Sequence, residues 1–253
     1  PQAEFEKAQN EYNAACAWFK AVAPLLPQTP EAVEQPIAMN KLPVIAIDGP
    51  AASGKGTLAR RIAAALGFAH LDTGTLYRVV GLAVLKAGKD PSDPQAALEA
   101  AEAFDLSLLE DPQLRMPATS AASSSVAAIP AVRAAVMSFQ RSFAANPPGS
   151  KGAVIDGRDI GTIICPDAAV KLYVTAALET RARRRFLELK SQGSPLTEAD
   201  VLADIRARDQ RDMTRPIAPL VQAPDARLLD TTHLDIETAV ARALEIIRTS
   251  LRT

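Results

Sequence analysis

The stretch GPAASGKGT at residues 49–57 constrains the fold of this chain more than any other segment. It follows an apolar run, PVIAI at residues 43–47, and it precedes a segment in which Leu58, Ile62 and Leu66 recur at helical spacing. A strand, a glycine-rich loop and a helix in this order form the context that a phosphate-binding loop requires. A glycine turn that merely connects a strand to a helix would not need the lysine between the glycines. The segment therefore predicts a protein that binds a polyphosphate.

The residue types in this loop suit that role. Backbone N–H groups can wrap a polyphosphate only where no side chain blocks the approach and positive φ is cheap, and we expect Gly49, Gly54 and Gly56 to supply those positions. The helix that begins near Lys55 directs its N-terminal donors and the positive end of its dipole at the anion. Lys55 adds a mobile charge that follows the phosphoryl group as it moves.

The spacing after the lysine bears on metal binding. The usual pattern places Ser or Thr directly after the lysine, whereas here Gly56 intervenes and the hydroxyl belongs to Thr57. We therefore expect Mg²⁺ to be held mainly by phosphates and water, with Thr57 as a candidate ligand.

Composition excludes some other classes of protein. The chain has 253 residues and a net charge of -1, which indicates one large globular domain without a general attraction to nucleic acid polymers or anionic membranes. The two cysteines lack metal-ligand spacing, and no apolar run approaches the ~20 residues that span a bilayer. No signal peptide is visible, so we expect a reduced, cytoplasmic protein. We also expect it to be a monomer.

Residues 1–38 differ in character from the rest of the chain. Apolar residues between Phe5 and Val22 recur at helical spacing, and four prolines between Pro24 and Pro36 follow as an extended linker. Met39 is a candidate natural start of the catalytic chain. We interpret the segment as an extension, a fusion remnant or a segment added for expression, and the alternative is a helix that docks on a partner surface.

From residue 43 onward, apolar strands alternate with helices, which predicts a doubly wound α/β core. The candidate strands are residues 43–48, 69–72, 153–156, 170–174 and 226–230. We expect helices from about Thr73 to Ala87, from Pro94, over residues 130–144 and over 234–251, and an irregular segment over 105–129. The excursion between the second and third strands is longer than a simple crossover, which indicates an inserted lobe.

Ligands of such sheets bind beyond the carboxyl ends of the strands, so the polar residues that follow each strand are candidates for the site. The third strand ends in VIDGRDIG, where Asp156 is positioned to hold Mg²⁺ through water. Arg158 and Asp159 should project toward the same crevice. The alternative for these two residues is a simple ion pair.

Two arginine-rich segments follow. In RARRR the spacing places Arg181, Arg184 and Arg185 on one helical face, so that three charges can meet one phosphate chain, whereas we interpret Arg183 as solvated. A capping box of Thr197 and Asp200 begins the next helix. In that helix, RARDQRDMTR places three further polar residues on one face: Arg208, Asp212 and Arg215. An exposed ladder of ion pairs would contribute only ~0.3–0.5 kcal/mol per pair, so a bound phosphate and ribose explain these residues better.

With GPAASGKGT, LDTGTLYR, VIDGRDIG and RARDQRDMTR in this order, residues 39–253 resemble the bacterial cytidylate kinases, members of the P-loop nucleoside monophosphate kinases. The resemblance implies a five-stranded parallel sheet flanked by helices, with an inserted nucleotide-binding lobe at about 73–150 and a short lid at about 181–196. It implies that ATP lies on the phosphate loop, that CMP or dCMP occupies the lobe, and that the γ-phosphoryl group passes to the 5′-phosphate of that acceptor.

The resemblance also implies roles for individual residues. The positions facing cytosine are Thr73, Arg133 and Asp159; those holding the acceptor phosphate are Arg78, Arg158 and Arg215; the sugar contacts are Ser124, Arg208 and Asp212. The residues expected to bind ATP are Gly49, Pro50, Ala51, Ala52, Ser53, Gly54, Lys55, Gly56 and Thr57. The expected catalytic groups are Lys55, Arg158, Arg181, Arg184 and Arg185, and the candidate metal ligands are Thr57 and Asp156.

The chemistry of cytosine agrees with this assignment. A carboxylate accepts a hydrogen bond from the exocyclic amine of cytosine and repels the carbonyl that uracil has there. Phosphoryl transfer then requires alignment and cationic stabilisation rather than a covalent intermediate, and closure of the lobe and lid excludes water. Two alternatives stay open. One is a kinase of the same fold that acts on UMP, AMP or a non-nucleotide acceptor, and the other is a nucleotide-binding switch or scaffold without turnover.

Overall fold

A computed structural model describes residues 42–191 and 193–251. The helix and linker predicted within residues 1–38 lie outside the described residues. The chain divides into two compact units. Of the described residues, 43–68, 154–191 and 193–251 form the loop unit, and 42 and 69–153 form the helical unit.

The loop unit contains most of the sheet and four long helices. Its elements are β1 (Val44–Asp48), α2 (Lys55–Leu66), β3 (Ala153–Gly157, whose first residue belongs to the helical unit), a π-helical turn (Ile160–Ile164), β4 (Val170–Thr175), α7 (Leu178–Ser191), α8 (Glu198–Thr214), β5 (Arg227–Asp230) and α9 (Ile236–Ser250). With β2 (Ala69–Asp72), the strands form a five-stranded parallel sheet in the order β2-β3-β1-β4-β5. All five predicted strands are confirmed to within one or two residues.

The register of the sheet positions the phosphate loop. Strand β1 pairs in parallel with β4 from Ile45 opposite Val170 to Asp48 opposite Tyr173. Every residue of β1 is buried, as expected for a parallel strand covered on both faces. The chain therefore leaves the carboxyl end of a central strand at Asp48 and enters residues 49–57 directly.

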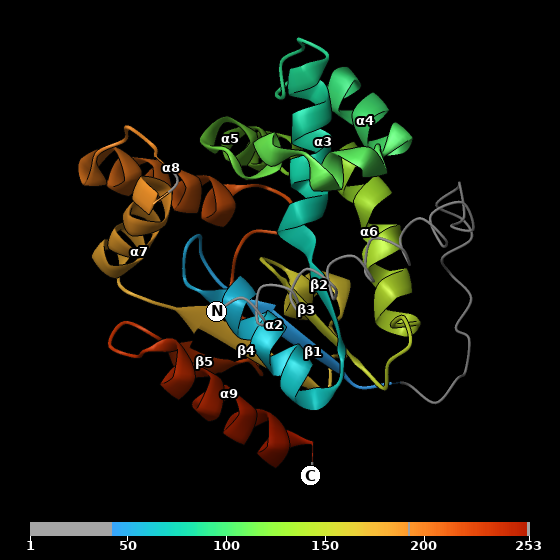
Figure 1. The fold of residues 1–253 in the computed structure, drawn as a ribbon. Helices are drawn as coiled ribbons and strands as arrows, with labels where there is room; N and C mark the ends of the chain where they lie inside the picture. Colours follow the sequence, from blue (N-terminus) through green and yellow to red (C-terminus); the bar gives the residue numbers. More distant parts are fainter. Residues whose placement is uncertain (1–41, 192, 252–253) are drawn as a thin grey trace. The chain divides into compact units, whose positions relative to one another are not determined.

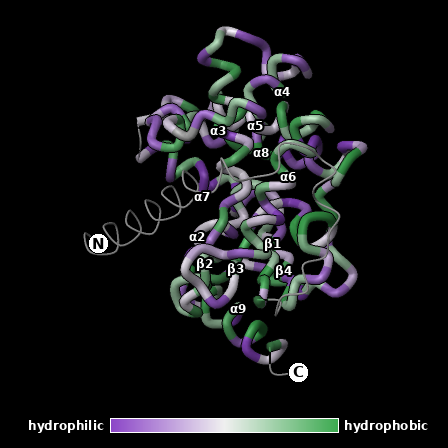
Figure 2. The backbone as a smooth tube through the Cα atoms, turned by 90° about the vertical axis from the view of Figure 1, so that its right-hand side faces the viewer, coloured by the Kyte–Doolittle hydropathy of each residue, from purple (hydrophilic) through white to green (hydrophobic). Residues whose placement is uncertain are grey.

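The core of the loop unit lies between the sheet and the helices α2 and α9, which run side by side (Figure 1). Leu58 and Ile62 of α2 and Ile247 of α9 are almost completely buried in it. Burial of a side chain of this size stabilises the fold by about 1.5–3 kcal/mol. Figure 2 shows hydrophobic and hydrophilic residues along α9, which is the pattern of a helix with one buried face.

Helices α7 and α8 form a second, smaller cluster of the loop unit (Figure 1). Ala182 and Leu189 of α7 pack against Val201 and Ile205 of α8, and Ala52 of the phosphate loop packs against the same cluster. The predicted capping box is confirmed: Thr197 accepts from the backbone N–H of Asp200, whose carboxylate accepts from that of Thr197.

The helical unit contains helices joined by short turns. Its elements are β2, α3 (Thr73–Lys86), α4 (Pro94–Ala103), two 3-10 helices (Leu106–Glu110 and Pro112–Arg115), α5 (Pro117–Val126) and α6 (Pro130–Ala145). The predicted helices of this unit are confirmed. Asp93 caps α4 by accepting from the N–H of Gln95, whereas Asp72 occupies the N-cap position of α3 without a capping hydrogen bond from its side chain.

The expectation of an irregular segment at residues 105–129 is wrong. Asp105 and Asp111 cap the two 3-10 helices, and prolines at the first positions of the second 3-10 helix and of α5 favour helical φ. Helix α5 then packs tightly on α3, where a Cβ on Gly81 would lie 2.9 Å from the backbone nitrogen of Ser123. Tertiary packing thus makes a helix of a serine-rich sequence with weak intrinsic helix propensity.

Among the described residues, none of the helices is by itself both long and apolar enough to cross a membrane, although the bent pair α5 and α6 passes this test together by length and composition.

Candidate active site

The backbone of the phosphate loop has positive φ at three positions. Gly49 has a φ of 155°, and a Cβ there would lie 2.0 Å from the carbonyl oxygen of Val174, so this position excludes every other residue. Gly54 has a φ of 84° at the N-cap of α2. The expectation that Gly56 has positive φ is wrong, because Gly56 is the second residue of α2. Ala52 takes the third left-handed position instead, with a φ of 57°.

Lys55 and Thr57 lie in the first turn of α2. The Nζ atom of Lys55 donates to the carbonyl oxygen of Pro50 at 3.4 Å, so the ammonium group folds back over the loop. Thr57 is exposed. Ser53 is buried, and its carbonyl oxygen accepts from the hydroxyl of Thr231 at 3.3 Å. The loop is therefore anchored to the segment that follows β5.

A buried ion pair ties the loop to α7 and α8. The guanidinium of Arg181 donates to Asp209 at 2.6 Å and to the carbonyl oxygen of Ala51 at 2.9 Å. The other carboxylate oxygen of Asp209 accepts from the N–H of Ala51 at 3.2 Å. Asp209 was not identified from the sequence. Asp209 lies four residues after the buried Ile205, which places its carboxylate on the inward face of α8. A carboxylate on a buried helical face is the sequence feature that could have identified it.

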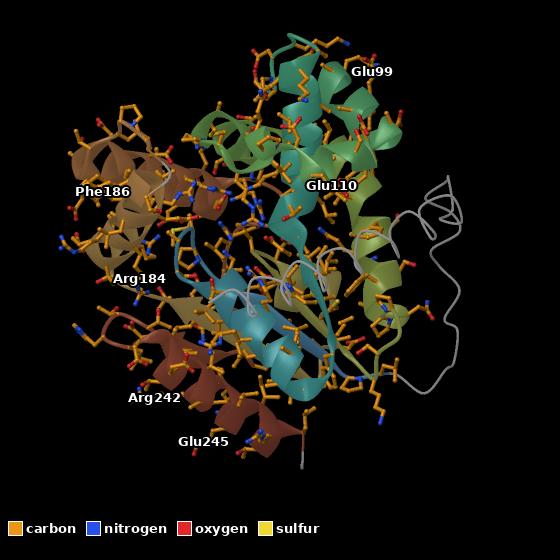
Figure 3. All side chains as sticks on the ribbon, viewed as in Figure 1. Glu99, Glu110, Arg184, Phe186, Arg242 and Glu245 are labelled. Atoms are coloured by element: carbon orange, nitrogen blue, oxygen red, sulfur yellow. The ribbon has the colours of Figure 1, made fainter. Side chains whose placement is uncertain are left out.

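The other arginines of α7 have separate partners. Arg184, labelled in Figure 3, donates to both the hydroxyl and the carbonyl oxygen of Thr231, at 3.1 and 2.6 Å. Arg185 pairs with Glu188 at 2.8 Å. Arg183 is exposed, as expected. The predicted convergence of Arg181, Arg184 and Arg185 on one phosphate chain thus stays a prediction, because in this structure each of the three contacts a different group of the protein.

A second array of arginines and carboxylates joins the end of β3 to α8. Arg158 donates from Nε to Asp212 at 2.8 Å. Burial alone would raise the pKa of Asp212, but the charges of Arg158, Arg208 and Arg215 outweigh it and hold that pKa below its ordinary value. The structure therefore brings Arg158 and Asp212 together, and their shared role in one site stays a prediction.

Arg215 and Asp159 form the other end of this array. Arg215 follows the last residue of α8, where its Nη2 atom lies 3.6 Å from the carboxylate of Asp159 and its Nε donates to the carbonyl oxygen of Ala218 at 2.5 Å. Both side chains are more than nine-tenths buried. An arginine and a carboxylate held this deeply require partners, and each of the two charges compensates the other.

Asp48 and Asp156 lie beside the phosphate loop. The carboxylate of Asp156 would be 3.7 Å from a Cβ on Gly56, so it faces the first turn of α2. Asp48 accepts from the N–H groups of Ile160 and Gly161, both at 2.8 Å. Burial raises the pKa of Asp48 to about 6, although these hydrogen bonds and Lys55 lower it.

The helical unit contains the other four predicted site residues. Thr73 begins α3 and is buried, and Ser124 is buried in α5. Arg133 is buried in the first turn of α6, where its guanidinium lies 5.7 Å from the ring centroid of Tyr77 and donates to the carbonyl oxygen of Ala127 at 3.2 Å. Arg78 is half-buried on α3. The contact between Arg133 and Tyr77 thus places the first turn of α6 against α3.

A parallel sheet that feeds a GPAASGKGT loop into the N-terminus of a helix, with a lysine in that first turn, defines a P-loop nucleotide-binding protein. The comparisons with known proteins make this class specific. Residues 45–249 match the family of cytidylate kinases, and the chain belongs to that family.

Similar curated proteins agree. The cytidylate kinase of Rhodospirillum rubrum is 56% identical over 205 residues, covering 81% of this chain and 96% of the relative. That of Rhodopseudomonas palustris is 57% identical over 204 residues, covering 81% and 95%. A solved structure of an uncharacterized protein from Eubacterium ventriosum has a TM-score of 0.49 at 17% identity, covering 83% of this chain and 99% of the other. A likeness of this size does not bear on function.

Proposed function

We propose that this chain transfers the γ-phosphoryl group of ATP to CMP or dCMP and so yields ADP with CDP or dCDP. Its membership of the cytidylate kinase family supports this reaction of a nucleoside monophosphate kinase. The observation that carries the two-substrate mechanism is the buried array of Arg158, Asp212, Arg215 and Asp159. The phosphate loop already accounts for one nucleotide, and a second set of buried arginines is what a second phosphate would need.

ATP binds with its phosphates in the loop of residues 49–57. The N–H groups of the loop and of the first turn of α2 donate to the phosphate oxygens, and Lys55 releases Pro50 to contact the β- and γ-phosphates. Arg181, Arg184 and Arg185 belong to a short lid, about residues 181–196, and neutralise charge that develops on the transferred group.

The acceptor nucleotide contacts three groups of residues. Arg78, Arg158 and Arg215 hold its phosphate, and Ser124, Arg208 and Asp212 contact its sugar. Thr73, Arg133 and Asp159 face the cytosine, where the carboxylate accepts from the exocyclic amine. The methyl group of Thr73, beside its hydroxyl, narrows the base pocket. The lobe that supplies the residues of the helical unit extends over about residues 73–150.

The cytidylate kinase family implies ATP with a divalent metal ion, and we propose Mg²⁺. Within the described residues no group of three or more His, Cys, Asp or Glu side chains is arranged to hold a metal. A buried carboxylate at Asp156 that faces the first turn of α2, with the hydroxyl of Thr57 on that turn, fits an ion that keeps several waters and phosphate oxygens. When bound, Mg²⁺ neutralises charge on the β- and γ-phosphates.

The first test is the formation of ADP from Mg-ATP with CMP, dCMP, UMP, AMP or no acceptor, each at the same concentration. We expect the fastest turnover with CMP and dCMP and almost none without an acceptor. A preference for another acceptor would keep the fold and mechanism but would refute the base pocket. The absence of any acceptor-dependent turnover would favour the nucleotide-binding switch or scaffold. Mass measurement in solution would test the expected monomer.

A further inference from the structure

The carboxylate of Asp48 binds the first turn that follows Asp159. Its two oxygens accept separately from consecutive residues, Oδ1 from the N–H of Ile160 and Oδ2 from that of Gly161, both at 2.8 Å. Asp48 is the last residue of β1, directly before the phosphate loop. These two hydrogen bonds therefore connect β1, which leads into the phosphate loop, to the segment that contains Asp159.

Asp159 occupies the N-cap position of the π-helical turn Ile160–Ile164, yet its side chain makes no capping hydrogen bond. An aspartate in this position ordinarily accepts from the N–H groups of its own turn. Here Asp48 binds those N–H groups from a different strand, and the carboxylate of Asp159 instead lies 3.6 Å from Arg215.

We infer that Asp48 is a positioning residue for base selection: by capping the turn in place of Asp159, it directs the carboxylate of Asp159 toward the base of the acceptor nucleotide. The inference rests on the proposed role of Asp159 in recognising cytosine. It goes beyond that role because Asp48 touches neither substrate in the proposed mechanism.

Gly161, in the turn that Asp48 binds, is closely packed against Lys171 and Asp48. A Cβ on Gly161 would lie 3.1 Å from Cδ of Lys171 and 3.4 Å from the carboxylate of Asp48. Lys171 is itself buried on β4 and paired with Asp225 at 2.8 Å. The turn therefore has little room to shift while Asp48 holds it.

The test compares kcat/KM for CMP with that for UMP in Asp48→Asn. The amide has one acceptor oxygen, so one N–H of the turn loses its partner and competes for the carboxylate of Asp159. We expect the ratio of CMP to UMP to fall by about tenfold or more, and the KM for ATP to change by less than about threefold. Asp235→Asn is the matched control, because Asp235 caps α9 by accepting from the N–H of Thr238 on an exposed helix end. Its ratio should equal that of the wild type.

Asp159→Asn separates this inference from the proposed function. If Asp159→Asn leaves the ratio unchanged, the role of Asp159 in base recognition is wrong. If Asp159→Asn lowers the ratio and a folded Asp48→Asn does not, the positioning role of Asp48 is wrong. Should Asp48→Asn fail to fold, Asp48→Glu provides the test, because its carboxylate reaches one methylene further and displaces the N–H groups of Ile160 and Gly161 from their present position. A ratio in a folded Asp48→Glu equal to that of the wild type would overturn the inference.

Discussion

Arg158 and Asp212 are joined at 2.8 Å although they lie 54 residues apart in the sequence, and the pair links the end of β3 to α8. Burial disfavours both charges, and the pKa of Asp212 is nevertheless lowered because three arginines surround it. Each group therefore depends on the other for its stability in the interior, and removal of one leaves an uncompensated charge.

We expect Asp212→Asn to destabilise the fold by about 3 kcal/mol at pH 7. Because the pKa of Asp212 is lowered in the folded state, the stabilisation by its carboxylate is present above the ordinary pKa of 3.8 and is lost as the pH falls through the lowered value. Urea unfolding at several pH values should show a constant difference in the free energy of unfolding between wild type and variant from pH 7 to 5. This difference should narrow below about pH 4. Asp204→Asn, an exposed change on the same helix, should show no such difference.

The contribution of Asp48 to the stability of the fold depends on pH in the opposite direction. Its pKa is raised from 3.8 to about 6, so the folded state favours the protonated group. Its contribution to stability is fully present below pH 3.8 and is lost as the pH rises through about 6, which amounts to roughly 3 kcal/mol at 1.4 kcal/mol per pKa unit. The amide in Asp48→Asn does not titrate, so the variant does not lose this stability as the pH rises. Its free energy of unfolding relative to that of the wild type should therefore rise between pH 4 and 7. A difference that stays constant over this range would show that Asp48 titrates normally.

Gly49→Ala tests the close approach in the phosphate loop. A Cβ there would lie 2.0 Å from the carbonyl oxygen of Val174, so the loop or β4 must move. We expect a loss of at least about 3 kcal/mol and no measurable ATP binding. Gly88→Ala is the control, since Gly88 has a φ of 68° in open space and should cost only about 1 kcal/mol. Similar losses in the two variants would mean that backbone strain, and not the contact with Val174, determines the cost.

Asp209 holds both Arg181 and the N–H of Ala51, and the amide of Asp209→Asn cannot accept with both of its terminal atoms. We expect the KM for ATP to rise by about tenfold, which corresponds to the loss of one hydrogen bond to a charged group. The KM for CMP should change much less. Steady-state kinetics would measure both, with Asp204→Asn as the matched change on α8. An unaltered KM for ATP in a folded variant would refute this role.

The strands and most helices could be predicted because their signals are local. Apolar runs, the Asp93 cap and the Thr197–Asp200 box each act within a few residues. Helix α5 was missed because its sequence is rich in serine and only its packing on α3 makes it helical. Asp48 and Asp209 were missed for a related reason. Their partners Ile160 and Ala51 are 112 and 158 residues away, and no spacing within one element indicates such a contact.

The four predicted site residues of the helical unit have roles that the resemblance alone supports, and Arg78 gives the sharpest test of them. Arg78 follows Tyr77 on α3 and is half-buried. If it holds the acceptor phosphate, Arg78→Ala removes a bidentate donor that strengthens as charge develops in the transition state. We expect kcat/KM for CMP to fall by about 100-fold or more, while the affinity for a non-hydrolysable ATP analogue changes by less than about twofold. Lys89→Ala is the control, because Lys89 is an exposed cation of the same unit that pairs with Glu99 at 2.9 Å. Wild-type transfer by Arg78→Ala would end the assignment, and an equal loss of affinity for the ATP analogue would move Arg78 to the donor site.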